Sequence, residues 1–384
     1  MRATPFQRTR KIYPLTSVRF FWAFYVVFHH TAKIFLPVFT TGMFNRVPPS
    51  YLDGLLFWVP ASLSFFFVLS GYVLSVVYLR EGKPVDKRKF WAARFARIYP
   101  LFFVTLVLDT PPLLFVKIHR NGLVLGLVKT AGVFGAHLLM LHGWYLQRLS
   151  GIDDANWSLS AETFFYLCFP AIGVLLWKLR GIWLWAVALG LYVGGQMLVF
   201  SVRSFPLVNP PFPLLHLSTF ALGILLARWQ ALQQDDREAK PVGAWPTYGV
   251  LVLAVAGIML SVKLAVTAAG HTQLFTGLLA PVFVGIIWAL SSTDTPVSRL
   301  LCTSWLVALG NASFALYLIH FPMLHLFEYF HWETRPMLYP AYLVLCVGLS
   351  VLSFYYFETP ARLWLLRRFH SRALETVEEA LSSQ

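Results

Sequence analysis

The sequence predicts an all-α fold, a polytopic membrane helix bundle of about ten transmembrane helices (10–11). Apolar residues make up 58% of the 384 positions and charged residues only 12%, about half of the charged share of a soluble domain. The mean hydropathy is +0.64. Runs of about 20 apolar residues, each long enough to cross roughly 30 Å of hydrocarbon, recur along the whole chain. We therefore expect one membrane domain rather than two or three soluble ones.

Eleven apolar stretches account for the expected helices. In order they lie near 15–36, 54–79, 98–116, 122–142, 158–177, 181–201, 212–229, 247–266, 272–291, 305–328 and 338–357. The net charge is +14, but the Lys and Arg residues stand in short runs between these stretches. That placement is typical of cytoplasmic loops under the positive-inside rule, so we expect no nucleic-acid partner.

The basic segments also constrain the number of spans. They are 1–11, 80–97, 178–180, 228–240, Arg299 and 362–372. Placing all of them in the cytoplasm requires an even number of spans between each pair, and only 98–177, with three stretches, breaks this rule. One stretch within 98–142, where Pro111 and Pro112 interrupt the apolar run, is therefore expected to be short, re-entrant or interfacial.

Ten spans with both termini in the cytoplasm follow from this topology. We divide the chain into a basic cytoplasmic N-terminus (1–14), a transmembrane domain (15–360) and a cytoplasmic tail (361–384). Residues 37–53 and 143–157 become outer loops. The basic N-terminus precedes an apolar run that is too long for a signal peptide and has no small-residue cleavage site, so it is expected to be an uncleaved first span. The three cysteines have no metal-binding spacing, and we expect neither a metal nor a disulfide.

Ionisable side chains inside apolar stretches are the candidate functional residues, because they are costly in a bilayer unless they are paired or line a wet cavity. Arg19 and His30 stand eleven residues apart in the first stretch. Eleven residues are three turns plus about 20°, so both share one face, roughly 16 Å apart along the axis. His30 is a candidate general base near neutral pH. Snorkelling of Arg19 to headgroups, and a bond from His30 to a backbone carbonyl, are the structural alternatives.

Two motifs suit either ligand binding or structure. Ser70 and Gly71 remove bulk in the middle of the second stretch, which allows a ligand or another helix backbone to approach. Arg94 and Arg97 at i and i+3 are neighbours on one helical face. Paired guanidinium groups at the cytoplasmic surface suit phosphate recognition, and contact with lipid phosphates explains them equally well.

Two later stretches carry polar stripes. In NWSLSAETFFYLCFP, Glu162 and Tyr166 share one face, and the carboxylate can orient a histidine, bind an acceptor hydroxyl or simply favour the helix start. In NASFALYLIHFPML, Ser313, Tyr317 and His320 stand at i, i+4 and i+7. This stripe must face a partner helix or a cavity.

Taken in order, these motifs resemble the acyltransferase-3 family of bacterial-type membrane O-acyltransferases. They are Arg19 with His30; Ser70, Gly71 and Tyr72; Arg94 and Arg97 with Pro100; Trp157, Ser158, Glu162, Tyr166 and Pro170; Ser313, Tyr317 and His320; and Glu358, Pro360 and Arg362. The resemblance spans 15 to about 365. The last group otherwise suits a charged helix end that anchors the bundle.

The resemblance implies transfer of an acyl group, usually acetyl, from acetyl-CoA or another acyl-CoA to a hydroxyl of a glycan, cell-surface polysaccharide or similar acceptor. No permanently bound cofactor is expected, and a bacterial inner membrane is the expected location. We expect catalysis by His30, Arg19 and Glu162, donor binding by Arg94, Arg97, Ser70 and Gly71, and acceptor binding by Trp157, Tyr166, Ser313, Tyr317 and His320. Tyr72 departs from the phenylalanine common in the family. The chain also continues only briefly past its last span, where many members carry a hydrolase-like domain.

A transporter or flippase of a glycan or lipid-linked substrate is the alternative. Polar stripes in a ten-span bundle suit a substrate path as well as a reaction chamber. Transporters often show internal repeats, and this sequence shows none. A structural scaffold would not need Arg19 and His30 in lipid. The acceptor, the acyl chain length and the oligomeric state stay open.

Overall fold

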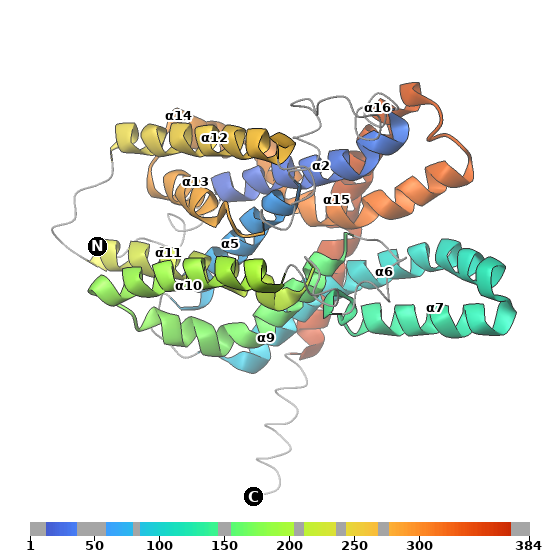
Figure 1. The fold of residues 1–384 in the computed structure, drawn as a ribbon, viewed down its shortest axis with the longest axis horizontal. Coiled ribbons are helices and arrows are strands. Elements are labelled where there is room, and N and C mark those ends of the chain that lie inside the picture. The colour runs from blue at the N-terminus through green and yellow to red at the C-terminus, as the bar shows by residue number, and fades with distance from the viewer. Residues whose placement is uncertain are drawn as a thin grey trace, which may run out of the picture.

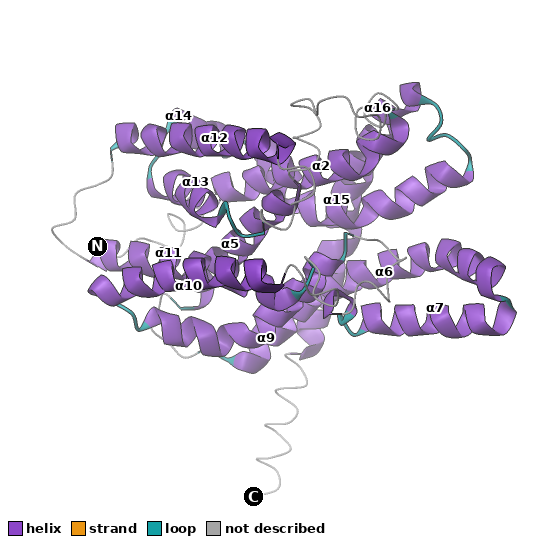
Figure 2. Ribbon diagram, in the orientation of Figure 1, coloured by secondary structure: helices purple, strands orange, loops and turns teal. Residues whose placement is uncertain are grey.

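The described chain is helical throughout, with every long helix on a predicted apolar stretch. The computed structural model describes residues 13–36, 59–79, 85–144, 155–202, 211–235, 243–267 and 276–369. These ranges contain no strand (Figure 2). Their eleven helices of 13 or more residues are α2 (Tyr13–Phe35), α5 (Val59–Tyr78), α6 (Lys87–Asn121), α7 (Leu123–Leu138), α9 (Trp157–Trp177), α10 (Gly181–Val202), α11 (Leu217–Asp235), α12 (Ala244–Thr267), α13 (Ala280–Ser292), α15 (Ser304–Tyr329) and α16 (Tyr339–Ser353). The predicted all-α bundle is confirmed.

Length and apolarity identify the membrane-spanning helices. Among the described residues, six helices are long and apolar enough to cross a bilayer: α6, α9, α10, α12, α15 and the helix that contains α16. α5, α7 and α13 are apolar but shorter over their described lengths. Only Leu184 and Val199 of the 22 residues of α10 are buried. An apolar helix with most of its residues exposed requires an apolar solvent, so the chain is an integral membrane protein.

The region around 98–142 forms a helical hairpin rather than an interrupted segment. α6 continues through Pro100, Pro111 and Pro112, so the prolines that interrupt the apolar run do not interrupt the helix. In lipid no water replaces lost backbone bonds, which favours helix continuation over an open loop. α6 is about 52 Å long and α7 about 24 Å, and the two run antiparallel at the right of Figure 1. Of the two apolar stretches expected within 98–142, the one that forms α7 is therefore the shorter helix.

Two close crossings organise the centre of the bundle. The most extensive helix–helix contacts of the bundle are those of α5 with α11 and of α2 with α15. A side chain at Gly71 would overlap the carbonyl of Phe220 on α11, and one at Gly310 on α15 would overlap the carbonyl of Thr16 on α2. Because only glycine allows backbones to approach this closely, these two positions set the spacing of the central helices.

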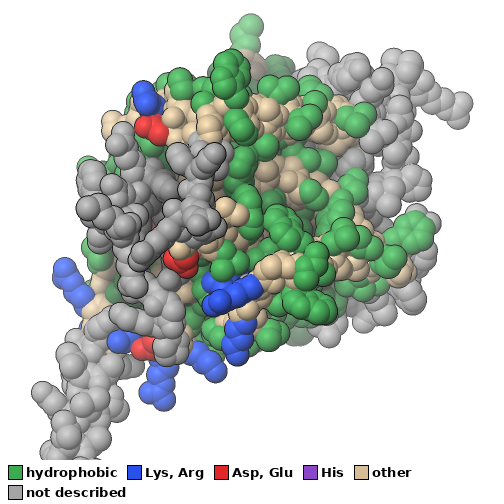
Figure 3. Space-filling model, turned by 90° about the vertical axis from the view of Figure 1, so that its left-hand side faces the viewer, with side chains coloured by type: hydrophobic (Ala, Val, Ile, Leu, Met, Phe, Trp, Pro, Cys, Tyr) green, Lys and Arg blue, Asp and Glu red, His purple; other side chains and the backbone are tan. Residues whose placement is uncertain are grey.

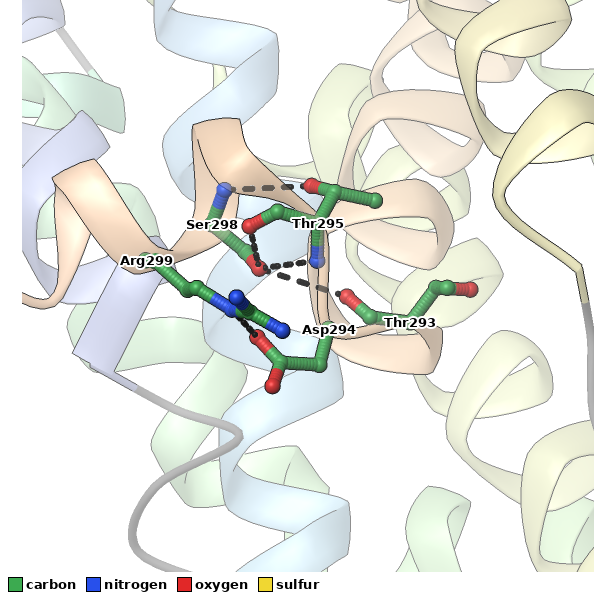
Figure 4. A network of polar contacts seen from close by, with 5 residues as sticks. All are labelled: Thr293, Asp294, Thr295, Ser298 and Arg299. Atoms are coloured by element: carbon green, nitrogen blue, oxygen red, sulfur yellow. Dashed lines mark hydrogen bonds and ion pairs between the residues drawn. The ribbon is translucent and has the colours of Figure 1, made fainter.

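Basic and capped turns gather at one end of the bundle. The turn from α9 to α10, the end of α11 and the start of α12 lie at the left of Figure 1, and Figure 3 shows Lys and Arg side chains on that face beside a broad hydrophobic surface. Arg228 Nε on α11 donates to the Leu179 carbonyl, 3.2 Å away. Thr295 and Ser298 form a reciprocal capping box at the start of α14 (Pro296–Leu301), beside the exposed Arg299 ion pair (Figure 4).

The last helix extends beyond the predicted domain boundary at residue 360. α16 passes into a π-helical turn (Phe354–Glu358), and the helix then continues to Phe369. The motif of Glu358 and Arg362 therefore lies inside a helix rather than at its end. The predicted outer loop 37–53, most of 143–157, most of the N-terminus and the tail after 369 lie outside the described residues.

Candidate active site

An internal cavity of about 250 Å³ lies where α2, α5, α6, α9 and α15 meet. Eight of the twelve predicted site residues line it, although they come from five helices: Arg19, Ser70, Arg94, Arg97, Glu162, Tyr166, Ser313 and Tyr317. The structure therefore brings these side chains together, while their chemical roles stay predictions. The volume is below the usual 300–1,000 Å³ of a ligand pocket, so the cavity fits the reacting end of a substrate rather than a whole nucleotide.

The cavity carries an excess of positive charge. Three arginines and one glutamate are the ionisable acid and base side chains among its lining residues, a formal excess of two positive charges. Nε of Arg94 is buried without a hydrogen-bond partner, and its guanidinium lies 5.8 Å from the ring centres of both Tyr78 and Tyr166. Such an environment favours an anionic ligand, because an anion would satisfy both the charge and the orphaned donor.

The paired arginines lie deeper than the surface position predicted for them. Arg94 and Arg97 are seven and ten residues after the start of α6, or about 10 and 15 Å along the helix. Both line the internal cavity. An anion held by them therefore sits within the bundle, and lipid headgroups alone do not explain this pair.

Glu162 joins α5 to α9 at the wall of the cavity. Ser70 Oγ donates to Oε1 of Glu162 at 3.3 Å, and the Tyr166 hydroxyl donates to the same oxygen. Nε1 of Trp91 on α6 donates to the Tyr166 carbonyl at 3.0 Å. The described contacts of Glu162 are thus with two hydroxyls and with no histidine.

Tyr317 connects the cavity to the start of α9. Its hydroxyl lies 2.7 Å from Ser158 Oγ and donates to the carbonyl of Ala155. Ser313, one turn earlier, donates to the Gly310 carbonyl of its own helix at 2.7 Å. The predicted polar stripe of α15 therefore faces both a cavity and a partner helix.

His30 and His320 form a pair beyond Tyr317 and do not line the cavity. Nδ1 of His30 lies 3.1 Å from Nε2 of His320, and the rings are nearly parallel, with centroids 5.3 Å apart. Nδ1 of His320 lies 2.6 Å from the Tyr317 carbonyl. A carbonyl oxygen can only accept a hydrogen bond, so His320 carries its proton on Nδ1. Nε2 of His320 then accepts a hydrogen bond from Nδ1 of His30, and the lone pair of the His30 ring lies on Nε2.

Gly71 and Trp157 do not reach the cavity. Gly71 packs against the backbone of α11, so of the two explanations for this glycine the structure supports helix packing. Trp157 packs its ring on His216 and Phe67, with centroid distances of 5.2 and 6.3 Å. The hydroxyl of Tyr72, the family departure, donates to Gln230 Oε1 at 2.7 Å and so joins α5 to α11.

Sequence reasoning missed three polar neighbours of the site. Thr16 and Asn311 line the cavity, and each stands just before a predicted site residue, Arg19 and Ser313, in the sequence. Glu358 is 6% exposed, its Oε2 has no hydrogen-bond partner, and it interacts electrostatically with Arg97. Glu358 is a carboxylate at the end of an apolar run and so met the criterion for a functional residue. We assigned it to an anchoring helix end and therefore did not predict it as a site residue. π-helical turns of this kind often mark functional sites.

The fold and the cavity define an integral membrane protein with an arginine-rich cavity inside its helix bundle. The family model described as an acyltransferase domain, acyltransferase-3, matches residues 12–355. The chain belongs to the acyltransferase-3 family, which confirms the resemblance seen in the sequence.

Two relatives illustrate the family. The acyltransferase MdmB of Streptomyces mycarofaciens is 31% identical over 282 residues, which cover 68% of this chain and 67% of that protein. The O-acetyltransferase OatA of Staphylococcus aureus is 24% identical over 325 residues, which cover 77% of this chain and 51% of OatA. The chain thus matches about half the length of OatA. No solved structure matches it.

Proposed function

We propose that this chain is a membrane O-acyltransferase that moves an acyl group, acetyl in the first instance, from an acyl-CoA to a hydroxyl of a glycan or similar acceptor. The main observation behind this proposal is one internal cavity that is lined by Arg19, Arg94 and Arg97 from two helices. Family membership and an O-acetyltransferase among the relatives support the reaction class. The proposal places the enzyme in a bacterial inner membrane with both termini cytoplasmic, so that the donor arrives from the basic end.

The arginines supply the donor site in this proposal. The phosphates of CoA meet Arg94 and Arg97, because guanidinium groups bind phosphate oxygens with paired, charge-assisted hydrogen bonds. The thioester then lies in the small cavity, and the bulk of the nucleotide stays toward the basic end. Arg19 stabilises negative charge that develops on the thioester oxygen.

The histidine pair supplies the base. The acceptor hydroxyl oxygen bonds to the thioester carbon as His30 Nε2 removes its proton, and the carbon–sulfur bond then breaks. The proton passes to the departing sulfur, so the products are an ester and CoA. His320 holds the His30 ring and disperses its positive charge, as the third group does in a catalytic triad. His320 is thereby a positioning residue here, in place of its predicted role in acceptor binding.

Purified protein in lipid nanodiscs tests this proposal. The donor is acetyl-CoA labelled in the acetyl group, and the acceptor probes are n-octyl β-glucoside and maltotriose, with CoA release and labelled product measured together. His30→Ala should lower transfer by about 10²-fold or more, the usual contribution of a general base. The matched control is His119→Ala, an exposed histidine on α6. Equal activity in the His30→Ala protein and the control overturns the role of His30.

The same preparation separates the mechanisms and the rival class. For the mechanism the label is placed in free CoA instead: its appearance in acetyl-CoA without acceptor identifies an acyl-histidine route, because exchange of CoA requires a covalent acyl-enzyme intermediate. Arg97→Ala should raise the KM for acetyl-CoA, and exposed Arg120→Ala should not. Nanodiscs hold no gradient, so labelled product requires catalysis. Movement of the glucoside across sealed vesicles without acetylation would identify a transporter instead.

A further inference from the structure

A second hollow, separate from the internal cavity, opens between α6, α15 and the last helix. It encloses about 700 Å³ and shares no lining residue with the cavity. Leu101, Leu108, Leu326 and Leu352 contribute to its mostly apolar wall, and we call it the lateral groove. Its volume lies within the 300–1,000 Å³ typical of ligand sites. Because Leu108, Leu326 and Leu352 are about half exposed on helices that face lipid, hydrocarbon chains have direct access to it.

The wall also holds hydroxyl residues, among them Thr105 and Ser353, and a histidine that pairs with a carboxylate. His325 lines the lateral groove, and its Nδ1 lies 2.9 Å from Oδ1 of Asp109. The Asp109 side chain is 0% exposed and that of His325 is 25% exposed. A carboxylate in the middle of an apolar helix is costly, and Oδ2 of Asp109 is buried without a hydrogen-bond partner, so the bond between α6 and α15 does not fully satisfy it. Oδ1 of Asp109 accepts a hydrogen bond from Nδ1 of His325, so the lone pair of the His325 ring lies on Nε2.

A single aromatic ring separates the lateral groove from the histidine pair. The Phe321 centroid lies 5.3 Å from that of His30, 4.6 Å from that of His320 and 6.1 Å from that of His325. His30 and His325 both contact the Phe321 ring, and Asp109 bonds to His325, so these side chains are neighbours. Asp109 lies about 18 Å beyond Arg97 along α6. His30 thus reaches the lateral groove through Phe321, and through His320 it is joined to Tyr317, which lines the cavity.

We propose that the lateral groove binds the hydrocarbon chain of a lipophilic alcohol with its hydroxyl at His325, and that a membrane-embedded acceptor reaches His30 by this route. The second half rests on the proposed function. The apolar wall selects a hydrocarbon chain, and the Asp109–His325 pair selects a neutral hydroxyl. The buried carboxylate repels a fatty-acid carboxylate or a lipid phosphate, because like charges at short range in low dielectric interact strongly. The occupant is therefore an alcohol rather than bulk phospholipid.

Photolabelling of the full chain in nanodiscs tests the groove without any donor. The probe is a hexadecanol analogue that carries a diazirine and an alkyne, and labelled peptides are mapped by mass spectrometry. Label should concentrate on the parts of α6 and α15 that line the groove. Unlabelled hexadecanol should displace it about tenfold better than palmitate, a factor equivalent to about 1.4 kcal/mol. His325→Ala should remove that preference, and His119→Ala should keep it.

A groove-filling variant separates specific binding from contact with surrounding lipid. Leu326→Trp fills the groove from a lipid-facing position that is 45% exposed, and Leu198→Trp on α10, 42% exposed, is its matched control outside the groove. Leu326→Trp should abolish the concentrated label, and Leu198→Trp should leave it. Even labelling of α6, α15 and α10, or equal competition by palmitate, overturns the proposal.

An acetyl-transfer experiment distinguishes failure of the proposed binding groove from failure of the proposed enzyme activity. With acetyl-CoA as donor and hexadecanol as acceptor, Leu326→Trp should raise the KM for hexadecanol several-fold and leave the KM for acetyl-CoA unchanged. Specific labelling without any acetyl transfer refutes the proposed function and retains the binding site. Transfer to hexadecanol that Leu326→Trp does not affect refutes the route.

Discussion

Replacing His320 with alanine tests the geometry on which the catalytic proposal depends. His320 is fully buried and lines neither the cavity nor the groove, so it contacts no substrate in either place. Its ring accepts a hydrogen bond from Nδ1 of His30 and donates one to the Tyr317 carbonyl. Without it His30 loses the group that selects its tautomer and shares its positive charge. We expect kcat to fall while the KM for acetyl-CoA stays near that of the parent.

The size of this effect follows from the bond that is removed. A hydrogen bond to a charged group contributes about 1.5–3 kcal/mol, and each 1.4 kcal/mol corresponds to a factor of about ten. The expected loss is therefore about 10- to 150-fold in kcat. His320→Gln should recover part of it, because the glutamine oxygen can accept from His30 while its amide donates to Tyr317.

The assay measures initial rates of CoA release and labelled ester in nanodiscs, together with thermal unfolding of each variant. His119→Ala again serves as the control. Comparable unfolding temperatures for the alanine and glutamine variants, with activity higher in the glutamine variant, would support positioning by His320. The reasoning is refuted if both variants retain the parental kcat, or if the change appears only in the KM for the donor.

Two further predictions concern the packing that holds the site. Gly71→Ala should lower the unfolding temperature sharply because the new methyl group overlaps the Phe220 carbonyl, whereas Gly190→Ala on α10 meets nothing within 4 Å; equal unfolding temperatures would contradict the close crossing. Tyr72→Phe should cost about 1 kcal/mol, the usual net value of one hydrogen bond, because Gln230 loses a donor, with kcat unchanged; a loss of activity would instead place Tyr72 in the reaction.

Local patterns predicted the helices well because the membrane leaves the backbone few alternatives. All eleven apolar stretches contain a helix, and the all-α membrane fold follows from the need to satisfy every backbone group within the bilayer. The same rule explains an error. The motif at Glu358 did not end the last helix, just as α6 continues through its paired prolines, because helix-breaking residues act less strongly where an open loop has no water to bind.

The site was only partly predictable for a different reason. Cost in lipid identified Arg19 and Glu162, spacing on one helical face identified Arg94 and Arg97, and the fold brought all four to one cavity. The same cost applies to Asp109, a carboxylate within the apolar stretch 98–116 that our prediction did not include. Gly71 satisfied a motif and yet faces another helix.

By itself the sequence determined where the helices lie, that they belong in a membrane, and which family the chain resembles, because helix periodicity and hydrocarbon thickness act within about 20 residues. Tertiary structure alone decided which polar faces meet. His30 and His320 are 290 residues apart, and Asp109 and His325 are 216 apart. Such pairs depend on how close two helices come and how each is rotated, and those quantities are set by side-chain and glycine packing across the whole bundle.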